Sequence, residues 1–436
     1  MNLFKLAFPL TLVSSLRFFG LFVVMPVISV YALSLGATPL MVGLAVGGYA
    51  LTQIIFQTPF GILADKFDKR LIIAFGLIIF ALGSLICAYT DNIYLLVIGR
   101  LLQGCGAISS VMSALLADLT PEEKRTQAMA IMGGGISFAF LLSMLIGPFV
   151  GGSYGVKTLF WIATFASILA LIILLFKIPK GEKIHYDYQQ DQNRFFYLKD
   201  LNLWMMYISA FLQKALVNLG FVIIPLVLFQ DFNFKTDELW KFYAPAGILG
   251  VFAMAPASIL AEKYGRYKSM MITGIIAFGI CFGLFCVSDY YQTFWLFVVG
   301  IIVFFIGFDI HEPIMQSLAS KYPKASQRGS ALGLLTTFGF LGSFLGAVLG
   351  GILYNAIGLF YLSLFIGGIC LLWILSLIIC LKNPPKQEIL FLPHNKGSQN
   401  LSKLEGILDY YQTQDQLIIK YNPNLIQEQI IKEHLK

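Results

Sequence analysis

The sequence predicts an all-α membrane protein with twelve transmembrane helices in two six-helix bundles, followed by a small α+β domain. Hydrophobic residues make up 58% of the 436 residues and charged residues only 12%, whereas soluble proteins contain about 25% charged residues. A spanning helix needs roughly 20 apolar residues, and such windows occur twelve times. Landmarks of the first six windows recur in the last six, which indicates a duplicated bundle.

The windows follow one another with short polar loops between them. They are 5–33, 39–64, 71–89, 93–117, 127–152, 158–177, 203–230, 240–261, 267–287, 293–319, 330–354 and 358–381. The first is too long for a cleaved signal peptide, so we expect it to be retained. The predicted units are a bundle at 1–178, a cytoplasmic linker at 179–202, a second bundle at 203–386 and a C-terminal domain at 387–436.

Basic residues gather in the loops on one side, and positive loops remain in the cytoplasm. The opposite loops carry only Lys157, Lys235 and Lys241. The positive loops carry Lys66, Lys69, Arg70, Lys124, Arg125, Lys177, Lys180, Lys183, Arg194, Lys199, Lys263, Arg266, Lys268, Lys321, Lys324 and Arg328. We therefore expect a multi-pass protein of a bacterial inner membrane with both termini in the cytoplasm. The net charge of +7 reflects these scattered loop charges, so no nucleic-acid partner is expected.

The composition after 386 is that of a water-soluble segment. An apolar run at 388–392, a polar stretch with helical spacing at 399–404, strand patterns at 406–412 and 416–421, and an amphipathic stretch at 425–435 predict a βαββα unit. A unit of about fifty residues is near the lower limit for independent folding. We expect it to need support from the bundle or from a second copy, and its candidate roles are self-association and ligand binding.

The charged turn between the second and third windows resembles a family signature. It contains Gly61, Leu63, Ala64, Asp65, Lys66, Lys69 and Arg70. This order resembles the Gly-x-Leu-Ala-Asp-Arg-x-Gly-Arg-Lys signature of the major facilitator superfamily, and the resemblance covers 5–381. Asp68 replaces the usual second glycine, and Lys69 the usual arginine.

The resemblance implies a gate at this turn. Asp65 is expected to face the start of the eleventh helix near Gly329, and Lys69 is expected to face Asp118. Lysine cannot form the bidentate pair of arginine, so a looser contact is expected. The alternative is a set of solvated charges that fix the topology. The predicted gating residues are Gly61, Asp65, Lys69, Arg70, Asp118 and Arg125.

The fourth window contains a buried arginine in a second family motif, made of Leu96, Arg100, Gln103, Gly104, Gly106 and Ala107. The resemblance links Arg100 to proton-coupled transport. An unpaired arginine at mid-span costs at least about 2.5 to 3.5 kcal/mol, so Arg100 is expected to face a cavity or a carbonyl cluster. A purely structural arginine is the alternative.

The fifth window matches the motif that distinguishes antiporters in the superfamily. Gly147, Pro148, Gly151 and Gly152 are present, and Ser143 replaces its first glycine. Small residues four apart let helices approach closely, and proline kinks the helix. A general packing motif is the alternative.

The tenth window contains Asp309, His311 and Glu312, of which the two acids share a helical face. A carboxyl group in a low-dielectric cavity can carry a proton, so these residues are candidates for proton coupling. The embedded cations Arg17 and Lys214 are candidate partners of the acids, with Lys214 preferred. The alternatives are a static ion pair and a His311 that only bonds a carbonyl.

The first two windows are similar to the twelve-span drug/proton antiporter branch, and within it to the YajR type. That type carries a small ferredoxin-like C-terminal domain, whose last strand is missing from the pattern here. Candidate residues of a substrate cavity are Tyr49, Gln53, Gln57, Gln103 and Asn218. Helix–helix hydrogen bonding explains each of them equally well.

These features imply a proton-coupled antiporter that exports small amphipathic compounds by alternating access. The proton gradient would supply the energy, and neither a cofactor nor a metal is expected. Two alternatives stay open: an exporter of sugars, nucleosides or metabolites, and a membrane-embedded sensor whose C-terminal domain binds a ligand or partner. An enzyme is not expected, because the four histidines are dispersed and no nucleotide-binding loop occurs.

Overall fold

The computed structural model describes residues 3–120, 122–179, 187–188, 196–393, 401, 404–413 and 416–434. Most of the predicted linker, including Lys180, Lys183 and Arg194, lies outside the described residues. So does most of the polar segment between the first two predicted strands of the C-terminal domain. Everything below concerns the described residues.

The first half of the chain forms the first six spans. Two spans are broken, each near glycine or proline: the first around Pro26 and the fourth around Gly106. The helices are α1 (Leu3–Phe22) and α2 (Ile28–Ser34), α3 (Pro39–Lys66), α4 (Lys69–Tyr89), α5 (Ile93–Cys105) and α6 (Ser109–Asp118), α7 (Glu122–Tyr154) and α8 (Val156–Lys177).

The second half forms the last six spans. The eleventh and twelfth are joined in one element, α14, in which Gly358 has φ +74° and turns the chain between them. The elements are α9 (Phe196–Lys199), α10 (Leu201–Gln230), η1 (Thr236–Glu238), α11 (Trp240–Tyr264), α12 (Tyr267–Tyr291), α13 (Phe294–Lys321), η2 (Ala325–Gln327) and α14 (Arg328–Cys380). Each predicted window thus corresponds to one helix or to a broken pair of helices, and the twelve-span fold is confirmed.

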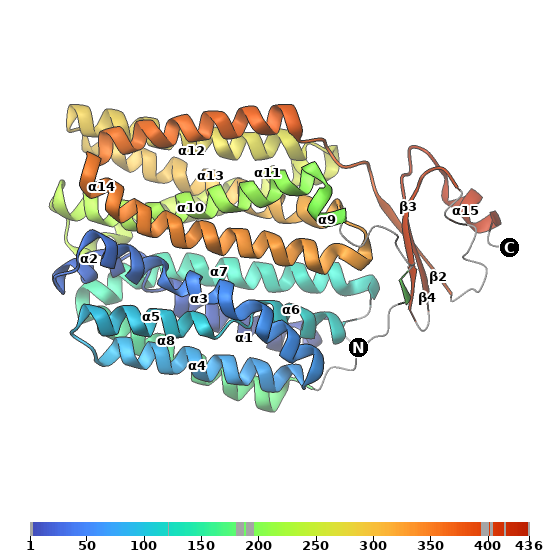
Figure 1. The fold of residues 1–436 in the computed structure, drawn as a ribbon, viewed down its shortest axis with the longest axis horizontal. Helices are drawn as coiled ribbons and strands as arrows, with labels where there is room; N and C mark the ends of the chain where they lie inside the picture. The colour runs from blue at the N-terminus through green and yellow to red at the C-terminus, as the bar shows by residue number, and fades with distance from the viewer. Residues whose placement is uncertain are drawn as a thin grey trace.

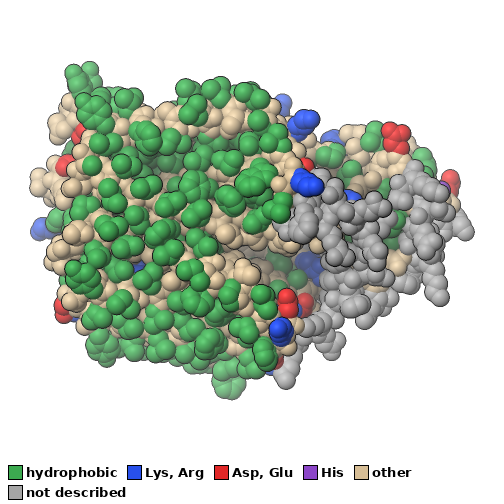
Figure 2. All heavy atoms as spheres, viewed as in Figure 1, with side chains coloured by type: hydrophobic (Ala, Val, Ile, Leu, Met, Phe, Trp, Pro, Cys, Tyr) green, Lys and Arg blue, Asp and Glu red, His purple; other side chains and the backbone are tan. Residues whose placement is uncertain are grey.

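The two halves lie side by side, with the small C-terminal domain at one end of the bundle (Figure 1). We call this the domain end and the opposite one the far end. The N-terminus lies at the domain end too (Figure 1). On the face seen in Figure 2, hydrophobic side chains cover the bundle, and most charged side chains lie toward its two ends. This distribution is the one that a lipid-facing surface requires.

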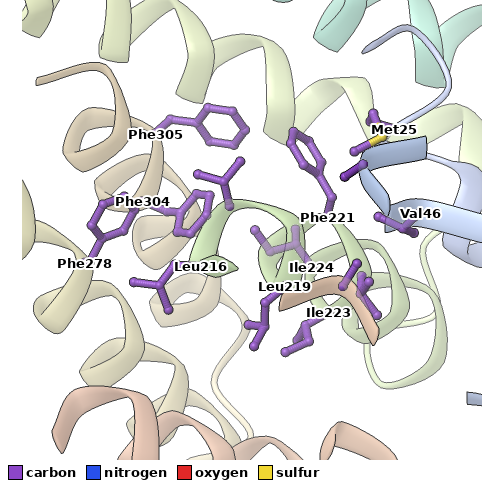
Figure 3. Close-up of a cluster of buried hydrophobic side chains, with 14 of the residues drawn as sticks. Met25, Val46, Leu216, Leu219, Phe221, Ile223, Ile224, Phe278, Phe304 and Phe305 are labelled. Atoms are coloured by element: carbon purple, nitrogen blue, oxygen red, sulfur yellow. The ribbon is translucent and has the colours of Figure 1, made fainter. Parts of the chain in front are cut away.

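A buried apolar cluster joins the two halves. Figure 3 shows Met25 and Val46 of the first half beside Phe221 of α10. The ring of Phe140 on α7 lies 6.2 Å from that of Phe221 and 5.6 Å from that of Phe308 on α13. The centre of the bundle is therefore lined by aromatic rings from both halves.

The C-terminal domain is a sheet with a helix packed on one face. Strands β2 (Glu388–Pro393), β3 (Ile407–Gln412) and β4 (Gln416–Tyr421) and helix α15 (Glu428–His434) agree with the predicted runs. The order is β1-β3-β4-β2 and all pairs are antiparallel. Strand β1 (Asp187–Tyr188), which comes from the chain between the two halves, was not predicted.

Candidate functional site

An ion pair joins α10 and α13 at the centre of the second half. Lys214 Nζ lies 2.9 Å from Glu312 Oε2, and about a quarter of each side chain is exposed, 27% and 26%. The ammonium also lies 5.3 Å from the centre of the Phe308 ring. The predicted pairing of Lys214 with Glu312 is therefore present, and the pair borders accessible space inside the bundle.

Asp309 lies one helical turn before Glu312, as the spacing predicts, and faces α11. A Cβ atom built on Gly250 would come within 2.0 Å of Asp309 Oδ2, so the carboxylate packs directly against this glycine. None of the described cations forms an ion pair with Asp309. The two acids thus differ: Glu312 holds Lys214, whereas Asp309 does not.

Behind the ion pair is a layer of fully buried polar side chains. His311 is 0% exposed and its ring lies 5.1 Å from that of Trp373, whose indole donates to Ser209 Oγ at 3.0 Å. Gln213 is also 0% exposed and lies beside Glu312. Among the described residues, neither ring nitrogen of His311 has a hydrogen-bond partner. Gln213 was missed from the sequence, although it directly precedes Lys214.

A row of polar residues follows one face of α3. Tyr49, Gln53 and Gln57 are four residues apart, and the Tyr49 hydroxyl lies beside Ser343 of α14 and Asn218 of α10. Gln53 and Asn218 are only 1% and 3% exposed, and each has an oxygen without a partner. This row crosses from one half to the other, and Ser343 is a member that the sequence did not indicate.

Arg100 is held by backbone carbonyls rather than by a cavity. It is 0% exposed and donates to Ala45 O at 2.9 Å, to Val46 O at 3.3 Å and to Gln103 Oε1 at 2.6 Å. Gln103 in turn donates to Ser84 at 2.7 Å. The prediction that Gln103 lines the cavity is therefore wrong, because its amide oxygen accepts from Arg100 and its amide nitrogen donates to Ser84.

Arg17 is likewise buried within the first half. It is 1% exposed, donates to Gly106 O at 3.0 Å and lies over the rings of Phe18 and Phe80 at 5.1 and 5.7 Å. The suggestion that Arg17 pairs with Asp309 or Glu312 is wrong. The carbonyl of Gly106, at the break between α5 and α6, is its backbone partner instead.

The charged turn between α3 and α4 is built around two ion pairs. Lys69 Nζ pairs with Asp118 Oδ2, as the resemblance implied. Asp68 accepts from the backbone N–H of Arg70 at 2.9 Å, and its side chain pairs with the guanidinium at 3.2 Å. Asp68 therefore caps α4, which gives the unusual residue of the signature a local role.

At the domain end the two halves stand apart. A Cβ atom on Gly61 or on Gly329 would meet no atom within 4 Å. The surface is hollowed between the halves near the C-terminal domain (Figure 2). Arg125 donates to Ala117 O at 3.2 Å within its own half. The approach of Asp65 to the start of the eleventh helix stays a prediction.

At the far end the two halves touch through glycines. A Cβ atom on Gly152 would lie 2.2 Å from Asp237 Cα, and one on Gly351 would lie 2.5 Å from Pro39 O. Gly152 is in the first half and Gly351 is its counterpart in the second. Each packs on the start of a helix in the other half, so the far end is closed by two matching contacts.

The rest of the glycine-proline motif packs α7 within its own half. A Cβ atom on Gly147 would lie 2.2 Å from Val23 O, and one on Gly151 would lie 2.9 Å from Leu159. Pro148 stands in the interior of α7. The close approach predicted for these residues is present.

Comparison with known proteins agrees with this architecture. The model of the Major Facilitator Superfamily matches residues 10–347 and 246–420. The chain is 34% identical to the inner membrane transport protein YajR of Escherichia coli (strain K12) over 348 residues, which are 78% of this chain and 75% of that protein. It is 27% identical to the quinolone resistance protein NorA of Staphylococcus aureus (strain MSSA476), over 78% of this chain and 87% of that one.

A solved structure shares the fold at low identity. The D-xylose–proton symporter superposes with a TM-score of 0.74 at 15% identity, over 88% of this chain and 99% of that one. The matched proteins are transporters and not enzymes. From the family match, the identity to YajR and the twelve spans in two halves, it follows that this chain belongs to the major facilitator superfamily and is a multi-pass membrane transporter.

Proposed function

We propose that the protein is a proton-driven antiporter that exports small amphipathic compounds across a bacterial inner membrane by alternating access. The observation that carries the proposal is the ion pair of Lys214 and Glu312 at 2.9 Å, bordering the space inside the bundle. An ion pair in a low-dielectric wall is strong only while both groups are charged. Binding of a proton to Glu312 therefore removes the attraction and frees Lys214.

The cycle follows from where the halves touch. The positive loops favour a cytoplasmic location of the domain end, and the halves touch at the far end. In the proposed cycle the described state is therefore the inward-open one. Glu312 or Asp309 takes up a proton when the site faces outward. After the halves rock, the proton leaves to the cytoplasm and the substrate binds, so that one is exchanged for the other.

The lining supports a substrate that is both polar and apolar. Phe308 lies against Lys214, and Phe140 of the other half lies 5.6 Å from Phe308. Tyr49, Gln53 and Asn218 add polar atoms across the halves. The similarity to a quinolone resistance protein also favours efflux of compounds of this kind.

The test is transport by purified protein in lipid vesicles with an imposed pH gradient. A panel of fluorescent amphipathic dyes serves as probe, and proton movement is followed with a pH-sensitive dye. We expect coupled movement of dye and protons in the wild type and its loss in Glu312→Gln. Glu428→Gln is the control, since this acid lies in the C-terminal domain with about half of its side chain exposed (46%). Equal coupling in Glu312→Gln and the control would refute the proposed mechanism.

Transport assays in the same vesicles distinguish two other candidate functions. Movement of labelled sugars or nucleosides, but of no amphipathic dye, would favour a metabolite exporter that uses the polar row on α3. A sensor would move none of these probes, and its C-terminal domain would bind a ligand or partner instead. The outward direction of transport is tested by loading the probe on either side of the membrane.

A further inference from the structure

The C-terminal domain is fixed to the second half of the transporter. Lys268 N donates to Asn383 Oδ1 at 3.0 Å, and Lys382 N donates to Asn202 Oδ1 at 2.9 Å. These bonds hold the chain that leaves α14 against the starts of α12 and α10. The domain therefore begins at a fixed point and moves with this half.

A second contact holds the sheet itself. Ala325 N, at the start of η2, donates to Asp409 Oδ2 on β3 at 2.7 Å. A carboxylate is favoured at the start of a helix because backbone N–H groups there lack partners. Successive residues of a strand point to opposite faces, so Asp409 faces the bundle whereas Tyr410 packs into the core of the domain.

The edge of the same strand holds a segment from between the two halves. Strand β1 pairs with β3 in the register Asp187 to Gln412 and Tyr188 to Tyr411. On the side of the first half, Ile178 O accepts a hydrogen bond from Arg70 at 3.0 Å. The connection is thus attached to the first half at Ile178 and to the domain at Asp187.

Strand pairing makes the connection between the halves short. Only about nine residues separate Ile178 from Asp187, and an extended chain spans at most about 3.6 Å per residue, or about 30 Å in all. Without the pairing, the next fixed point among the described residues is Leu198 on α9, whose carbonyl accepts from the Trp204 indole at 2.9 Å. The free connection would then be more than twice as long.

We propose that the C-terminal domain binds the connecting segment as a strand and thereby limits how far the halves separate at the domain end. The proposal rests on the alternating access proposed above, because only a moving pair of halves has a separation to limit. The domain holds the connecting segment through the pairing of β3 with β1, so the segment that it binds belongs to the same chain.

The pairing is tested by cross-linking in membranes, with the native cysteines replaced. Tyr188→Cys with Tyr411→Cys places cysteines opposite each other in the register. Tyr188→Cys with Gln412→Cys is the control, because adjacent residues point to opposite faces. We expect an intramolecular disulfide in the first pair and much less in the second, detected by mass spectrometry of peptides. Dimers, or equal yields in both pairs, would overturn the proposal.

The limit on separation is tested by distance measurements between spin labels. Labels replace Lys66 and Ser326, which are exposed at the domain end of either half. In Tyr188→Pro, which removes a backbone donor from β1, and after deletion of 387–436, we expect the distances to become longer and broader. Gln192→Pro, a change in the same connection outside β1, serves as control.

Unchanged distances in Tyr188→Pro and in the deletion would overturn the proposal. This outcome is distinct from failure of the antiport mechanism, because the distances are measured without a substrate. A variant Glu312→Gln that retains coupled transport would reject the antiport mechanism and leave the distances as they are.

Discussion

Two buried arginines show how single residues fix the first half. Arg100 and Arg17 are buried, and both donate to backbone carbonyls: Arg100 to Ala45 and Val46 on α3, and Arg17 to Gly106 at the break between α5 and α6. A buried charge without partners would be costly, so these carbonyls stabilise the two arginines inside the first half. The sequence correctly placed Arg100 at a cavity or a carbonyl cluster. It could not choose between them, because the carbonyls belong to α3 and come close only through packing.

Replacing Arg100 is expected to destabilise the protein. In Arg100→Gln, buried acceptors lose their donor, at about 1 to 3 kcal/mol each. Thermal unfolding of the purified protein should show a melting temperature lower by several degrees. The control Lys157→Gln removes an ion pair with exposed Asp91, which contributes about 0 to 1 kcal/mol. Equal melting temperatures for the two variants would contradict the assigned role.

Transport is expected to depend on the positive charge at position 214 rather than on the shape of the side chain. In Lys214→Gln the deprotonated Glu312 loses its partner at 2.9 Å, so we expect proton-coupled transport to fall by at least about tenfold, the equivalent of 1.4 kcal/mol. Lys214→Arg keeps the charge and should retain more of the activity. The measurement is flux in vesicles, and a Gln variant as active as the Arg variant would refute the role.

At the scale of elements, broken helices were harder to predict than helices. The apolar windows gave the spans, since lipid requires them. They did not show that the first span is two helices, whereas the break between the eleventh and twelfth windows was predicted next to Gly358, where α14 turns. Strand β1 was missed because two residues carry no periodicity. Its pairing depends on the edge of β3, which is remote in the sequence.

Glycines at the far end are expected to control the closure of that end. Leucine at Gly152 or Gly351 would overlap Asp237 or Pro39, where a Cβ atom already comes within 2.2 or 2.5 Å. We expect Gly152→Leu and Gly351→Leu to open the far end. Spin labels at Asp91 and Gln292, exposed in loops of either half, should then show longer distances.

The matched control for the glycine variants is Gly283→Leu on α12. A Cβ atom at this position meets nothing within 4 Å, so the same gain in side-chain size is tolerated. If Gly283→Leu lengthened the distances as much as the other two variants, close packing at the far end would not be the cause.

For the whole molecule, the distribution of charge decides the orientation in the membrane. Lys66 lies at the domain end and Asp91 at the far end of the same half. Two variants, Lys66→Cys and Asp91→Cys, are treated with a membrane-impermeant thiol reagent in spheroplasts whose inner membrane is intact. The reagent should label only position 91. Permeabilised cells should show labelling of both. Labelling of position 66 in intact cells would reverse the proposed orientation.

The two glycine contacts at the far end also bear on how such a chain arose. Gly152 on Asp237 and Gly351 on Pro39 are one contact repeated in reverse, as in the self-complementary interface of a two-fold dimer. An ancestral half that paired with a second copy of itself would have made this contact twice. Once the two copies were fused into one chain, their sequences no longer had to be identical. Pro39 and Asp237 could therefore diverge while both glycines remained.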